Sequence, residues 1–463
     1  MMSSKWPLII VANRLPVVRA HRKGASTWKR SPGGLVSALT PIVRKAGGAW
    51  VGWTGVTGAA PQPFELDGIM NIPVSISRGE QRTFYDGFCN ATLWPLYHGG
   101  LREPEYHRAW WRQYAAINKR FAEIAAQAAD NGACVWIHDY HLQLVPALLR
   151  ELRPDLRIGF FLHTPFPPGE LFDRLPWRRQ LLQGILGSDV VGFQTREGTQ
   201  NFVRLARRHT TATLKGNKLQ MNGHSALVHD YPISTDFQRF AAAAEDASVT
   251  RRAEEIKRRV GGGRRIILGV DRLDYTKGID VRLRALAELF ARNGQITRDS
   301  VVVQVAVPSR ERVSQYRELR SQIEELVGQI NGEFSEVGMT PVQYIFREQP
   351  FEKLVALYRA ADVALVTPLA DGMNLVAKEY VATRYDNTGV LVLSEFAGAS
   401  RELNSALQVN PHDVDGMAET LAVALSLPSS EVSRRMRRMR DVVRRHNVYS
   451  WADSFMEAMA CRA

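Results

Sequence analysis

Short apolar runs rich in β-branched residues alternate along the chain with longer stretches in which apolar positions recur at helical spacing. Strands that alternate with helices indicate a parallel sheet covered by helices. The strands are expected at 8–12, 134–137, 157–162, 189–195, 264–270, 301–307, 342–346, 362–367 and 389–394. The pattern therefore predicts an α/β protein.

The strands fall into two sets, and the segment between them predicts two domains. A chain of 463 residues is too long for one ordinary hydrophobic core. The separating segment, "VHDYPISTDFQRF" at 228–240, ends a strand and continues with Pro and polar turn residues. We predict an N-terminal domain over 1–235 and a C-terminal domain over 236–446, with 447–463 forming a helix that crosses back to the first domain.

Composition and charge exclude two classes of partner. With 45% hydrophobic and 23% charged residues, the chain resembles a soluble globular protein, and no apolar run approaches the ~20 residues that cross a bilayer. A large share of the net charge of +13 lies in "SRRMRRMRDVVRRH" at 433–446. This stretch lacks interleaved aromatic residues and accompanies no nucleic-acid-binding motif, so it predicts a solvated helix. We expect neither a nucleic-acid nor a membrane partner.

The three cysteines, Cys89, Cys134 and Cys461, are far apart in the sequence and odd in number. This spacing indicates neither a disulfide framework nor a zinc site, and it is typical of a reducing compartment. We therefore predict a cytoplasmic protein without disulfides.

Polar residues follow the predicted strands where each strand ends. In open parallel sheets, ligands bind outside these carboxyl ends. The clusters are Asn13–Arg14, "HDYH" at 138–141, "HTPFP" from 163, "DRLDYTKG" at 271–278, "PSR" at 308–310 and "PLADGMN" at 368–374. One such cluster alone is usually a cap or a turn. Clusters that follow strands in both halves indicate a shared cleft.

The chemistry of these clusters favours a phosphorylated sugar as ligand. Permanent cations and a Gly-Gly pair at a helix start both suit phosphate, and there are enough for two anionic groups. Aromatic rings pack on sugar faces. The cations are Arg14, Arg272, Lys277 and Arg310, the glycines are Gly33 and Gly34, and the rings are Trp53, Tyr85, Trp94 and Tyr140.

Other ligand classes fit less well. No G-x-G-x-x-G follows the first strand, and no Walker A sequence is present, so a dinucleotide or P-loop site is not expected. The "DVD" at 413–415 resembles a metal-binding pair of acids, but its position before an apolar helix favours an N-cap.

Taken together, the motifs resemble the trehalose-6-phosphate synthase family from about residue 8 to the C-terminus. They are "ANRLPV", "SPGGL", "WVGWTG", "NATLWPLYH", "WIHDYHLQLVP", "GFFLHTPFP", "VDRLDYTKG", "PSR", "DGMNLVAKEYVA" and "NPHD". The resemblance implies a GT-B fold, in which two Rossmann-like domains face a central cleft. It also implies transfer of glucose from a nucleotide-diphosphate glucose (GDP- or UDP-glucose) to glucose 6-phosphate, with retention of configuration and an α,α-1,1 linkage.

The resemblance also implies roles for individual residues. The predicted acceptor residues are Arg14, Trp53, Tyr85, Trp94, Asp139 and Arg310. The predicted donor residues are Gly34, Arg272 and Lys277 for the diphosphate, His163, Asp371, Gly372, Met373, Asn374 and Leu375 for the glucose, Glu379 for the ribose, and Leu354 near the base. Of these, Arg272, Lys277, His163 and Asp371 are the predicted catalytic residues.

Physical chemistry supports this mechanism independently. Charge grows on the diphosphate as the glucosyl bond breaks, and a fixed cation aimed at it contributes ~3 kcal/mol. Because Arg272 and Lys277 supply that charge, we expect no metal, and the nucleotide sugar is a co-substrate rather than a cofactor. In the family's proposed mechanism the leaving phosphate takes the acceptor proton, so no protein base is needed. The chain carries no second catalytic region, which predicts that a separate phosphatase acts on the product.

The donor base and the oligomeric state are not determined by the sequence. Glu348 in "YIFREQPFEKL" would accept hydrogen bonds from the N1 and N2 hydrogens of guanine, for which uracil offers no comparable pair, which makes GDP-glucose at least as plausible a donor as UDP-glucose. A glucosylglycerol-phosphate synthase with the same donor chemistry is the alternative within this class. Whether the chain forms a homo-oligomer is left open by the sequence.

The two acids of "DGMNLVAKE", Asp371 and Glu379, first suggest the carboxylate pair of a glycosidase. If a helix starts near Met373, they lie roughly 12 Å apart along its axis. Retaining glycosidases need about 5 Å and inverting ones no more than ~9.5 Å. The spacing instead favours a helix that reaches along an extended nucleotide sugar, from its glucose to its ribose.

Overall fold

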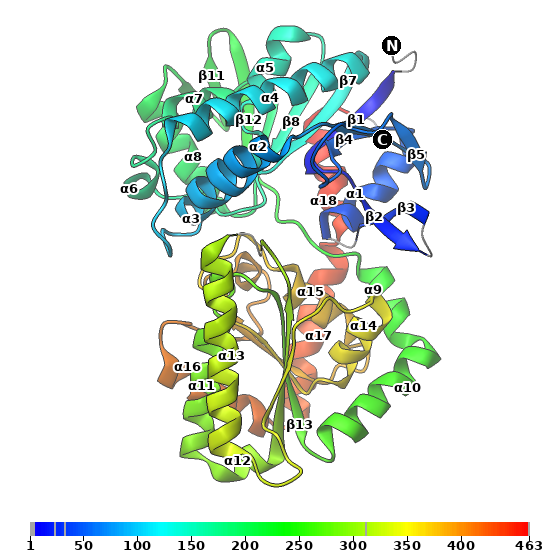
Figure 1. Cartoon of the computed structure of the whole chain (residues 1–463), viewed down its shortest axis with the longest axis vertical. Coiled ribbons are helices and arrows are strands. Elements are labelled where there is room, and N and C mark those ends of the chain that lie inside the picture. The colour runs from blue at the N-terminus through cyan, green and yellow to red at the C-terminus, as the bar shows by residue number, and fades with distance from the viewer. Residues whose placement is uncertain (1–4, 23–24, 32–33, 311–312, 462–463) are drawn as a thin grey trace. The chain divides into compact units, whose positions relative to one another are not determined.

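The computed structural model describes residues 5–22, 25–31, 34–310 and 313–461, which form two compact units (Figure 1). Unit 1 comprises residues up to Ile233 together with Tyr449 onward, and unit 2 comprises Ser234–Val448. The predicted domain boundaries, after residues 235 and 446, lie close to these. A cleft between the two units depends on how they are placed relative to one another, so it stays a prediction.

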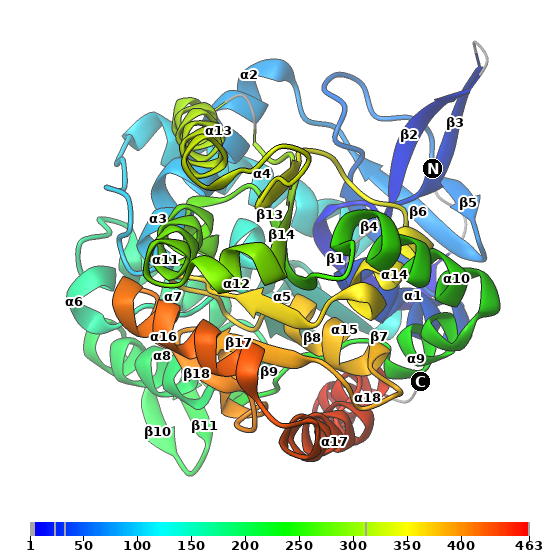
Figure 2. The ribbon, with the colours of Figure 1, turned by 90° about the horizontal axis from the view of Figure 1, so that it is seen from below.

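Unit 1 is built on a ten-stranded, mostly parallel sheet. In spatial order its strands are β10 (Thr213–Lys215), β11 (Lys218–Met221), β12 (His224–Asp230), β9 (Val190–Phe193), β8 (Arg157–Phe161), β7 (Ala129–His138), β1 (Trp6–Arg14), β4 (Ala49–Trp53), β6 (Ile69–Val74) and β5 (Phe64–Leu66). Among the described strands of this sheet, the antiparallel pairs are β10–β11, β11–β12 and β5–β6. A separate hairpin of β2 (Val17–Arg22) and β3 (Ala25–Arg30) projects from the unit (Figure 2).

Helices connect and cover these strands. They are α1 (Gly34–Lys45), α2 (Arg78–Glu80), the π-helix η1 (Gln81–Leu93), α3 (Trp94–Tyr97), α4 (Arg108–Ala128), η2 (Tyr140–Leu142), α5 (Val145–Leu152), α6 (Gly169–Phe172), α7 (Arg178–Ile185), α8 (Arg196–His209) and α18 (Val448–Ala458). The helix α4 lies on β1, β4, β6 and β7. Its buried positions, Tyr114, Ile117, Phe121 and Ala125, recur at helical spacing, so α4 presents one apolar face to the sheet.

Unit 2 is built on a six-stranded parallel sheet. Its strands, in spatial order, are β15 (Val342–Ile345), β14 (Ser300–Val307), β13 (Arg265–Arg272), β16 (Val363–Val366), β17 (Val390–Ser394) and β18 (Leu407–Val409). Figure 1 shows α11 (Ile279–Arg292) and α13 (Ser314–Phe334) on one side of them and α14 (Phe351–Ala360) on the other. The other helices are α9 (Phe237–Glu245), α10 (Ala247–Ile256), η3 (Lys257–Gly261), η4 (Tyr275–Lys277), α12 (Gly294–Asp299), α15 (Leu375–Thr383), η5 (Gly398–Arg401), α16 (Val414–Ser426) and α17 (Ser429–Arg445).

The predicted α/β class is confirmed, and each predicted strand overlaps one in the structure. The prediction missed strands whose apolar runs are short or interrupted, such as β4, which contains Gly52, and β6, which contains Asn71 and Pro73. The "DVD" segment is a helix N-cap as predicted, because the Asp413 carboxylate accepts the Gly416 N–H at 2.9 Å.

Both sheets have a point at which the strand order reverses. In unit 2 the chain moves outward from β13 through β14 to β15, and then returns to the other side of β13 to place β16. In unit 1 the corresponding reversal lies between β1 and β7. At such a point, adjacent loops leave the sheet in opposite directions and open a crevice for a ligand. The ends of β1, β7, β13 and β16 are therefore the places to look for a site.

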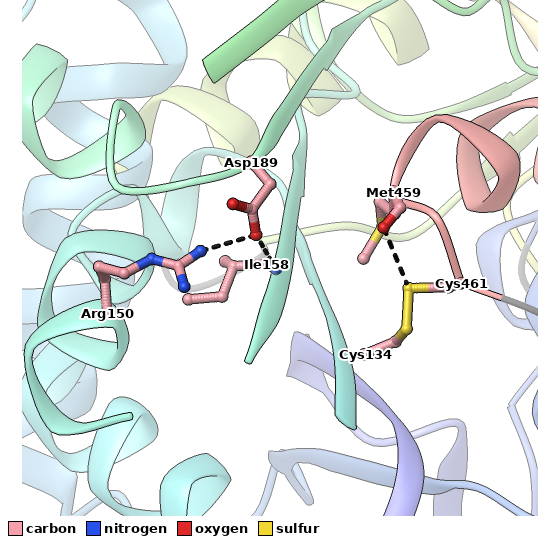
Figure 3. Close-up of a disulfide and its surroundings, with 6 residues drawn as sticks. All are labelled: Cys134, Arg150, Ile158, Asp189, Met459 and Cys461. Atoms are coloured by element: carbon pink, nitrogen blue, oxygen red, sulfur yellow. Dashed lines mark hydrogen bonds and ion pairs between the residues drawn. A yellow bond between two sulfur atoms is a disulfide. The ribbon is translucent and has the colours of Figure 1, made fainter. Parts of the chain in front are cut away.

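The C-terminal segment corrects the prediction for the cysteines. The structure joins Cys134 of β7 to Cys461 by a disulfide, with Cα atoms 6.2 Å apart (Figure 3). Cys89 is buried and takes no part in a disulfide among the described residues. The two cysteines are 327 residues apart in sequence. They meet because α18 returns to unit 1, where the Phe455 ring stacks on Trp136 at 4.5 Å. A helix over 447–463 that crosses back to the first domain is predicted from the sequence, but the spacing of the cysteines does not indicate that Cys134 and Cys461 meet.

None of the helices in the described part of the chain is long and apolar enough to span a bilayer.

Candidate active site

The first cluster lies in unit 1, at the ends of β1 and β4. Arg14 is the last residue of β1, and its guanidinium carbon lies 4.8 Å from the centroid of the Trp53 ring. Its carbonyl accepts the Trp50 indole N–H at 3.0 Å. Gly55 has φ of +84°, and a Cβ there would lie 2.0 Å from an Arg14 nitrogen. Glycine at 55 therefore leaves the space in which the Arg14 side chain lies.

A line of rings continues from Trp53. Tyr85 meets Trp53 edge-on at 5.8 Å, and its other neighbour, His141, stacks nearly parallel to it at 5.9 Å. Tyr85 belongs to the π-helix η1, a form that is frequent at functional sites. Within η1, the Asn90 amide donates to the Tyr85 carbonyl at 2.7 Å. Edge-on and stacked rings of this kind stabilise one another by about 0.5–1.5 kcal/mol per pair.

Trp94 joins the same cluster through Tyr140. It is the first residue of α3, directly after η1, and its ring lies 5.6 Å from that of Tyr140. The Tyr140 hydroxyl donates to the Asn90 side chain at 3.0 Å. The indole ring of Trp94 is buried, so its position is fixed by packing.

Asp139 and His163 follow the neighbouring strands β7 and β8. Asp139 has φ of +76°, and its carboxylate accepts the His163 backbone N–H at 3.3 Å. The Asp139 carboxylate also lies 3.9 Å from the His141 ring. The His163 ring meets that of His138, with His163 Nε2 3.1 Å from His138 Nδ1.

Burial keeps both of these imidazoles neutral. Desolvation lowers the pKa of His163 to about 3 and that of His138 well below its usual value. At neutral pH neither ring carries a charge, so neither acts as an acid. We name Arg14, Trp53, Tyr85, Trp94, Asp139, His141 and His163 the unit 1 cluster.

The second cluster lies in unit 2, at the ends of β13 and β16. Arg272 is the last residue of β13, and it is exposed. Lys277 ends η4, and its Nζ lies 2.5 Å from the Asp371 carboxylate in an ion pair whose side chains are 13% and 14% exposed. Gly278, at φ +61°, follows directly, and a Cβ there would lie 2.4 Å from the Thr367 carbonyl. The structure thus brings two predicted catalytic residues into contact.

The loop that carries Asp371 is held by its backbone. The Asp371 N–H donates to the Phe396 carbonyl at 3.2 Å, and the Gly398 and Ala399 N–H groups donate back to Asp371 and Met373 at 3.1 and 2.8 Å. A Cβ at Gly398 would lie 2.0 Å from the Gly372 carbonyl oxygen. Only glycine lets the two segments approach this closely.

The helix after this loop starts later than predicted. It begins at Leu375 rather than Met373, because Asn374 at φ +82° is its N-cap. The Asn374 side chain accepts the Ala377 N–H at 3.1 Å and donates to the Asp371 carboxylate at 3.0 Å. Asp371 therefore lies outside the helix. The estimated separation of Asp371 and Glu379 along a helix axis does not apply, because only Glu379 is helical.

Glu379 lies on the second turn of α15 and accepts a hydrogen bond from the Tyr358 hydroxyl at 2.9 Å. Burial raises the pKa of Glu379 to about 7. Two other predicted donor residues lie in this region: Leu354 is half-buried on α14, and Glu348 is exposed in the segment before α14.

Arg310 is the predicted acceptor residue that lies in unit 2. It follows β14 at φ +48°, and its guanidinium contacts the buried Asp274 at 2.8 Å and the Tyr316 hydroxyl at 2.5 Å. The other predicted acceptor residues belong to unit 1, so the role of Arg310 toward the acceptor stays a prediction. We name Arg272, Asp274, Lys277, Arg310 and Asp371 the unit 2 cluster.

Gly34, predicted for the donor diphosphate, is the first residue of α1 in unit 1. Its neighbour Gly33 lies outside the described residues. Within the described ranges, no three His, Cys, Asp or Glu side chains gather in a way that would hold a metal ion.

Several residues that hold these clusters received no individual role from the sequence. They are Asp274, Tyr316, Tyr358, His138 and His141. Asp274, His138 and His141 lie in motifs that follow predicted strands, so their position was a usable signal. Tyr316 and Tyr358 lie on helices and carry no such signal.

The sequence matches a known family and its solved structures over nearly its whole length. The matched family is Glycosyltransferase family 20, over residues 7–461. The trehalose-6-phosphate synthase of Mycolicibacterium gilvum is 50% identical over 99% of this chain and 95% of its own length. The enzyme of the same name from Mycobacterium tuberculosis strain H37Rv is 52% identical over 98% and 94%.

Two solved structures resemble the fold closely. The UDP-forming α,α-trehalose-phosphate synthase of Burkholderia xenovorans, in complex with glucose 6-phosphate, has a TM-score of 0.90 and 35% identity, covering 98% of this chain and 99% of its own. An E. coli structure bound with UDP-2-fluoro glucose has a TM-score of 0.90 and 34% identity, with the same coverage.

Proposed function

The chain belongs to glycosyltransferase family 20, and on that premise we propose that it transfers glucose from a nucleoside-diphosphate glucose to glucose 6-phosphate. The products are α,α-trehalose 6-phosphate and the nucleoside diphosphate, with retention at the anomeric carbon. The observation that carries the proposal is the similarity to trehalose-6-phosphate synthases over almost the full length of both chains. Their shared name favours this acceptor over the glucosylglycerol-phosphate alternative.

We assign the donor to the unit 2 cluster, because that is where fixed charge gathers. Negative charge grows on the diphosphate as the bond to glucose breaks, and a preorganised cation lowers that barrier by about 2.7–4 kcal/mol. Arg272 and Lys277 follow the strand at which the sheet order reverses. The ion pair with Asp371 fixes the Lys277 ammonium, and the N–H groups at the start of α15 suit an anion.

We assign the glucose 6-phosphate acceptor to the unit 1 cluster except His163, which we keep with the donor glucose. Arg14 is a permanent cation that suits a phosphate, and the rings of Trp53 and Tyr85 beside it suit a sugar face. Asp139 offers carboxylate oxygens to hydroxyl groups. The contribution of Arg310 to the acceptor phosphate stays a prediction.

The proton of the acceptor hydroxyl needs a destination. His163 is neutral, and its Nε2 already meets His138. We therefore keep the leaving phosphate as the group that takes the proton, so that the same charge that Arg272 and Lys277 stabilise also acts as the base.

The remaining part of the proposal is which nucleotide the glucose donor carries. Several similar solved enzymes are described as UDP-forming, which supports UDP-glucose. The exposed Glu348, ahead of α14, supports GDP-glucose if it reaches the base. Replacement of Glu348 by Gln should weaken GDP-glucose selectively, and an unchanged donor preference would remove Glu348 from the site.

The test is to incubate the protein with glucose 6-phosphate and UDP-, GDP- or ADP-glucose, and to measure nucleoside diphosphate and disaccharide phosphate together. Dephosphorylation followed by trehalase digestion identifies the α,α linkage. We expect equal amounts of the two products with at least one donor. Glycerol 3-phosphate as acceptor, and a reaction without acceptor, are the controls. Absence of turnover with every donor, or faster transfer to glycerol 3-phosphate, would overturn the proposal.

A further inference from the structure

The two histidines that end β7 and follow β8 form a pair that the proposed reaction does not yet use in full. His138 is completely buried, and its Nδ1 lies 3.1 Å from Nε2 of the half-buried His163. The pairing of the strands holds the two rings in place, because His138 is in register with Phe161 and the Asp139 N–H donates to the Phe161 carbonyl at 2.8 Å.

One proton is shared between these two nitrogen atoms. Desolvation lowers the pKa of both imidazoles below the physiological range, so each ring carries a single N–H. Two arrangements satisfy the contact. Either His138 donates from Nδ1 to a lone pair on His163 Nε2, or His163 donates from Nε2 to a lone pair on His138 Nδ1.

The other nitrogen of His138 decides between them. His138 Nε2 is buried and has no hydrogen-bond partner among the residues that the structure describes. If His163 were the donor, the His138 proton would have to reside on Nε2, leaving a buried N–H group unpaired. If His138 is the donor, Nε2 carries only an unpaired lone pair. Buried N–H groups without a partner are the rarer case in folded proteins.

We propose that His138 is a positioning residue that donates its Nδ1 proton to His163 and thereby fixes the His163 proton on Nδ1. Nε2 of His163 is then occupied as an acceptor. Its Nδ1–H makes no hydrogen bond within the described residues and is available to a ligand as a donor. Hydroxyl and phosphate oxygens both accept such a bond.

The consequence for the reaction rests on the proposed function. With its proton held on Nδ1, His163 binds an oxygen of the sugar or phosphate and has no free lone pair with which to deprotonate the acceptor hydroxyl. His138 thus excludes His163 as a general base and leaves that task to the leaving phosphate. The ring of Trp136, 4.9 Å from His138, shields this pair on one side.

The direct test is the proton position in the wild-type protein, read by nitrogen NMR on a sample labelled with ¹⁵N-histidine. The spectrum of the His163→Gln variant assigns the His163 signals. We expect a protonated Nδ1 and an unprotonated Nε2 at pH 7. A proton on Nε2, or on both nitrogens, would overturn the proposal. This measurement does not depend on turnover, so it stands apart from any failure of the proposed function.

Kinetics test the coupling. The His138→Phe variant keeps a ring but removes the donor, and we expect kcat/KM for the nucleotide sugar to fall about tenfold. The His138→Asn variant places an amide N–H near the position of Nδ1, and we expect it to recover most of that loss. In a His163→Ala background, His138→Phe should not lower kcat/KM for the nucleotide sugar any further. An equal loss in both backgrounds, or no recovery with Asn, would show a merely structural role and contradict the proposal.

Discussion

The unit 1 and unit 2 clusters occupy equivalent places in similar sheets, yet different forces hold them. In unit 1, rings and one arginine contact each other through their faces and edges, from Arg14 through Trp53 to Tyr85. In unit 2, charged side chains are paired at 2.5 and 2.8 Å, as in Lys277–Asp371 and Arg310–Asp274, and the Asp371 loop is tied by backbone hydrogen bonds.

The difference follows the chemistry assigned to each cluster. Breaking the donor bond develops charge, and stabilising that charge requires cations that do not reorganise during the reaction. Buried partners fix such cations, and removing one partner of a buried pair costs about 3–5 kcal/mol. The acceptor is recognised by its shape and one phosphate, for which ring contacts of about 0.5–1.5 kcal/mol each are enough. Substitutions in the unit 2 cluster should therefore reduce activity strongly, whereas substitutions in the unit 1 cluster should reduce it by smaller amounts.

The largest expected effect is the loss of a cation from unit 2. Replacement of Arg272 by Ala should reduce kcat at least ~100-fold, because the leaving diphosphate loses a fixed positive charge. The measurement is steady-state turnover with saturating glucose 6-phosphate. Arg437→Ala, which removes another exposed arginine of unit 2, on α17, is the control and should retain activity. Turnover of Arg272→Ala near that of the control would refute the role.

Two glycine substitutions compare the clusters directly, because each added Cβ would come within 2.0 Å of a neighbour. At Gly398 the neighbour is the backbone carbonyl of Gly372, so alanine must displace the donor loop. A displacement of about 1 Å can cost ~100-fold in rate. At Gly55 the neighbour is the end of the flexible Arg14 side chain, which can swing away, although alanine there is also strained because φ is +84°.

We therefore expect Gly398→Ala to reduce kcat/KM for the nucleotide sugar about 100-fold. Gly55→Ala should raise KM for glucose 6-phosphate about tenfold, through the lost charge-assisted contact of Arg14. Thermal unfolding of both variants separates these effects from a loss of folding. The comparison fails if Gly55→Ala impairs the donor more than the acceptor.

The next effect depends on pH. Because the pKa of Glu379 is raised to about 7, its carboxylate becomes protonated as the pH falls through 7 and loses the charge that would accept ribose hydroxyl groups. At pH 6 about nine-tenths of Glu379 is protonated, so KM for the donor should rise up to about tenfold between pH 8 and 6. The Glu379→Gln variant should show a flat donor KM over this range, apart from the titration of the substrates. An identical pH profile in both proteins would remove Glu379 from the donor site.

The smallest expected effect on activity concerns the disulfide. Cys134→Ser releases residue 461 from β7, and because the crosslink spans 327 residues its loss should lower stability by about 2–4 kcal/mol. Activity at 25 °C should stay within about twofold, because neither cysteine belongs to a cluster. Thiol alkylation with and without reductant, followed by intact mass measurement, reports the bond. One free thiol is expected in the native protein, and three would show that the cysteines are reduced.

The sequence predicted those features that local pattern controls. Apolar runs such as 301–307 are strands because their β-branched residues suit a buried parallel sheet. Arg14 and Arg272 end strands and Asp371 follows one, which is where ligands bind in open parallel sheets. Features that depend on long-range contact escaped it. Cys134 meets Cys461 only because α18 packs in unit 1. Arg310, which follows β14, forms an ion pair with Asp274, which follows β13. The late start of α15 depends on one backbone angle at Asn374, which no periodicity encodes.

The central claim is that the unit 1 cluster, apart from His163, recognises the acceptor and that the unit 2 cluster, apart from Arg310, recognises the donor. Its most direct test is calorimetric titration of glucose 6-phosphate and of UDP-glucose, each into Arg14→Ala and Arg272→Ala. We expect Arg14→Ala to weaken glucose 6-phosphate by about 10-fold or more and UDP-glucose by less than about twofold, and Arg272→Ala to do the reverse. If Arg14→Ala chiefly weakens UDP-glucose, or Arg272→Ala chiefly weakens glucose 6-phosphate, the assignment of the two clusters is wrong.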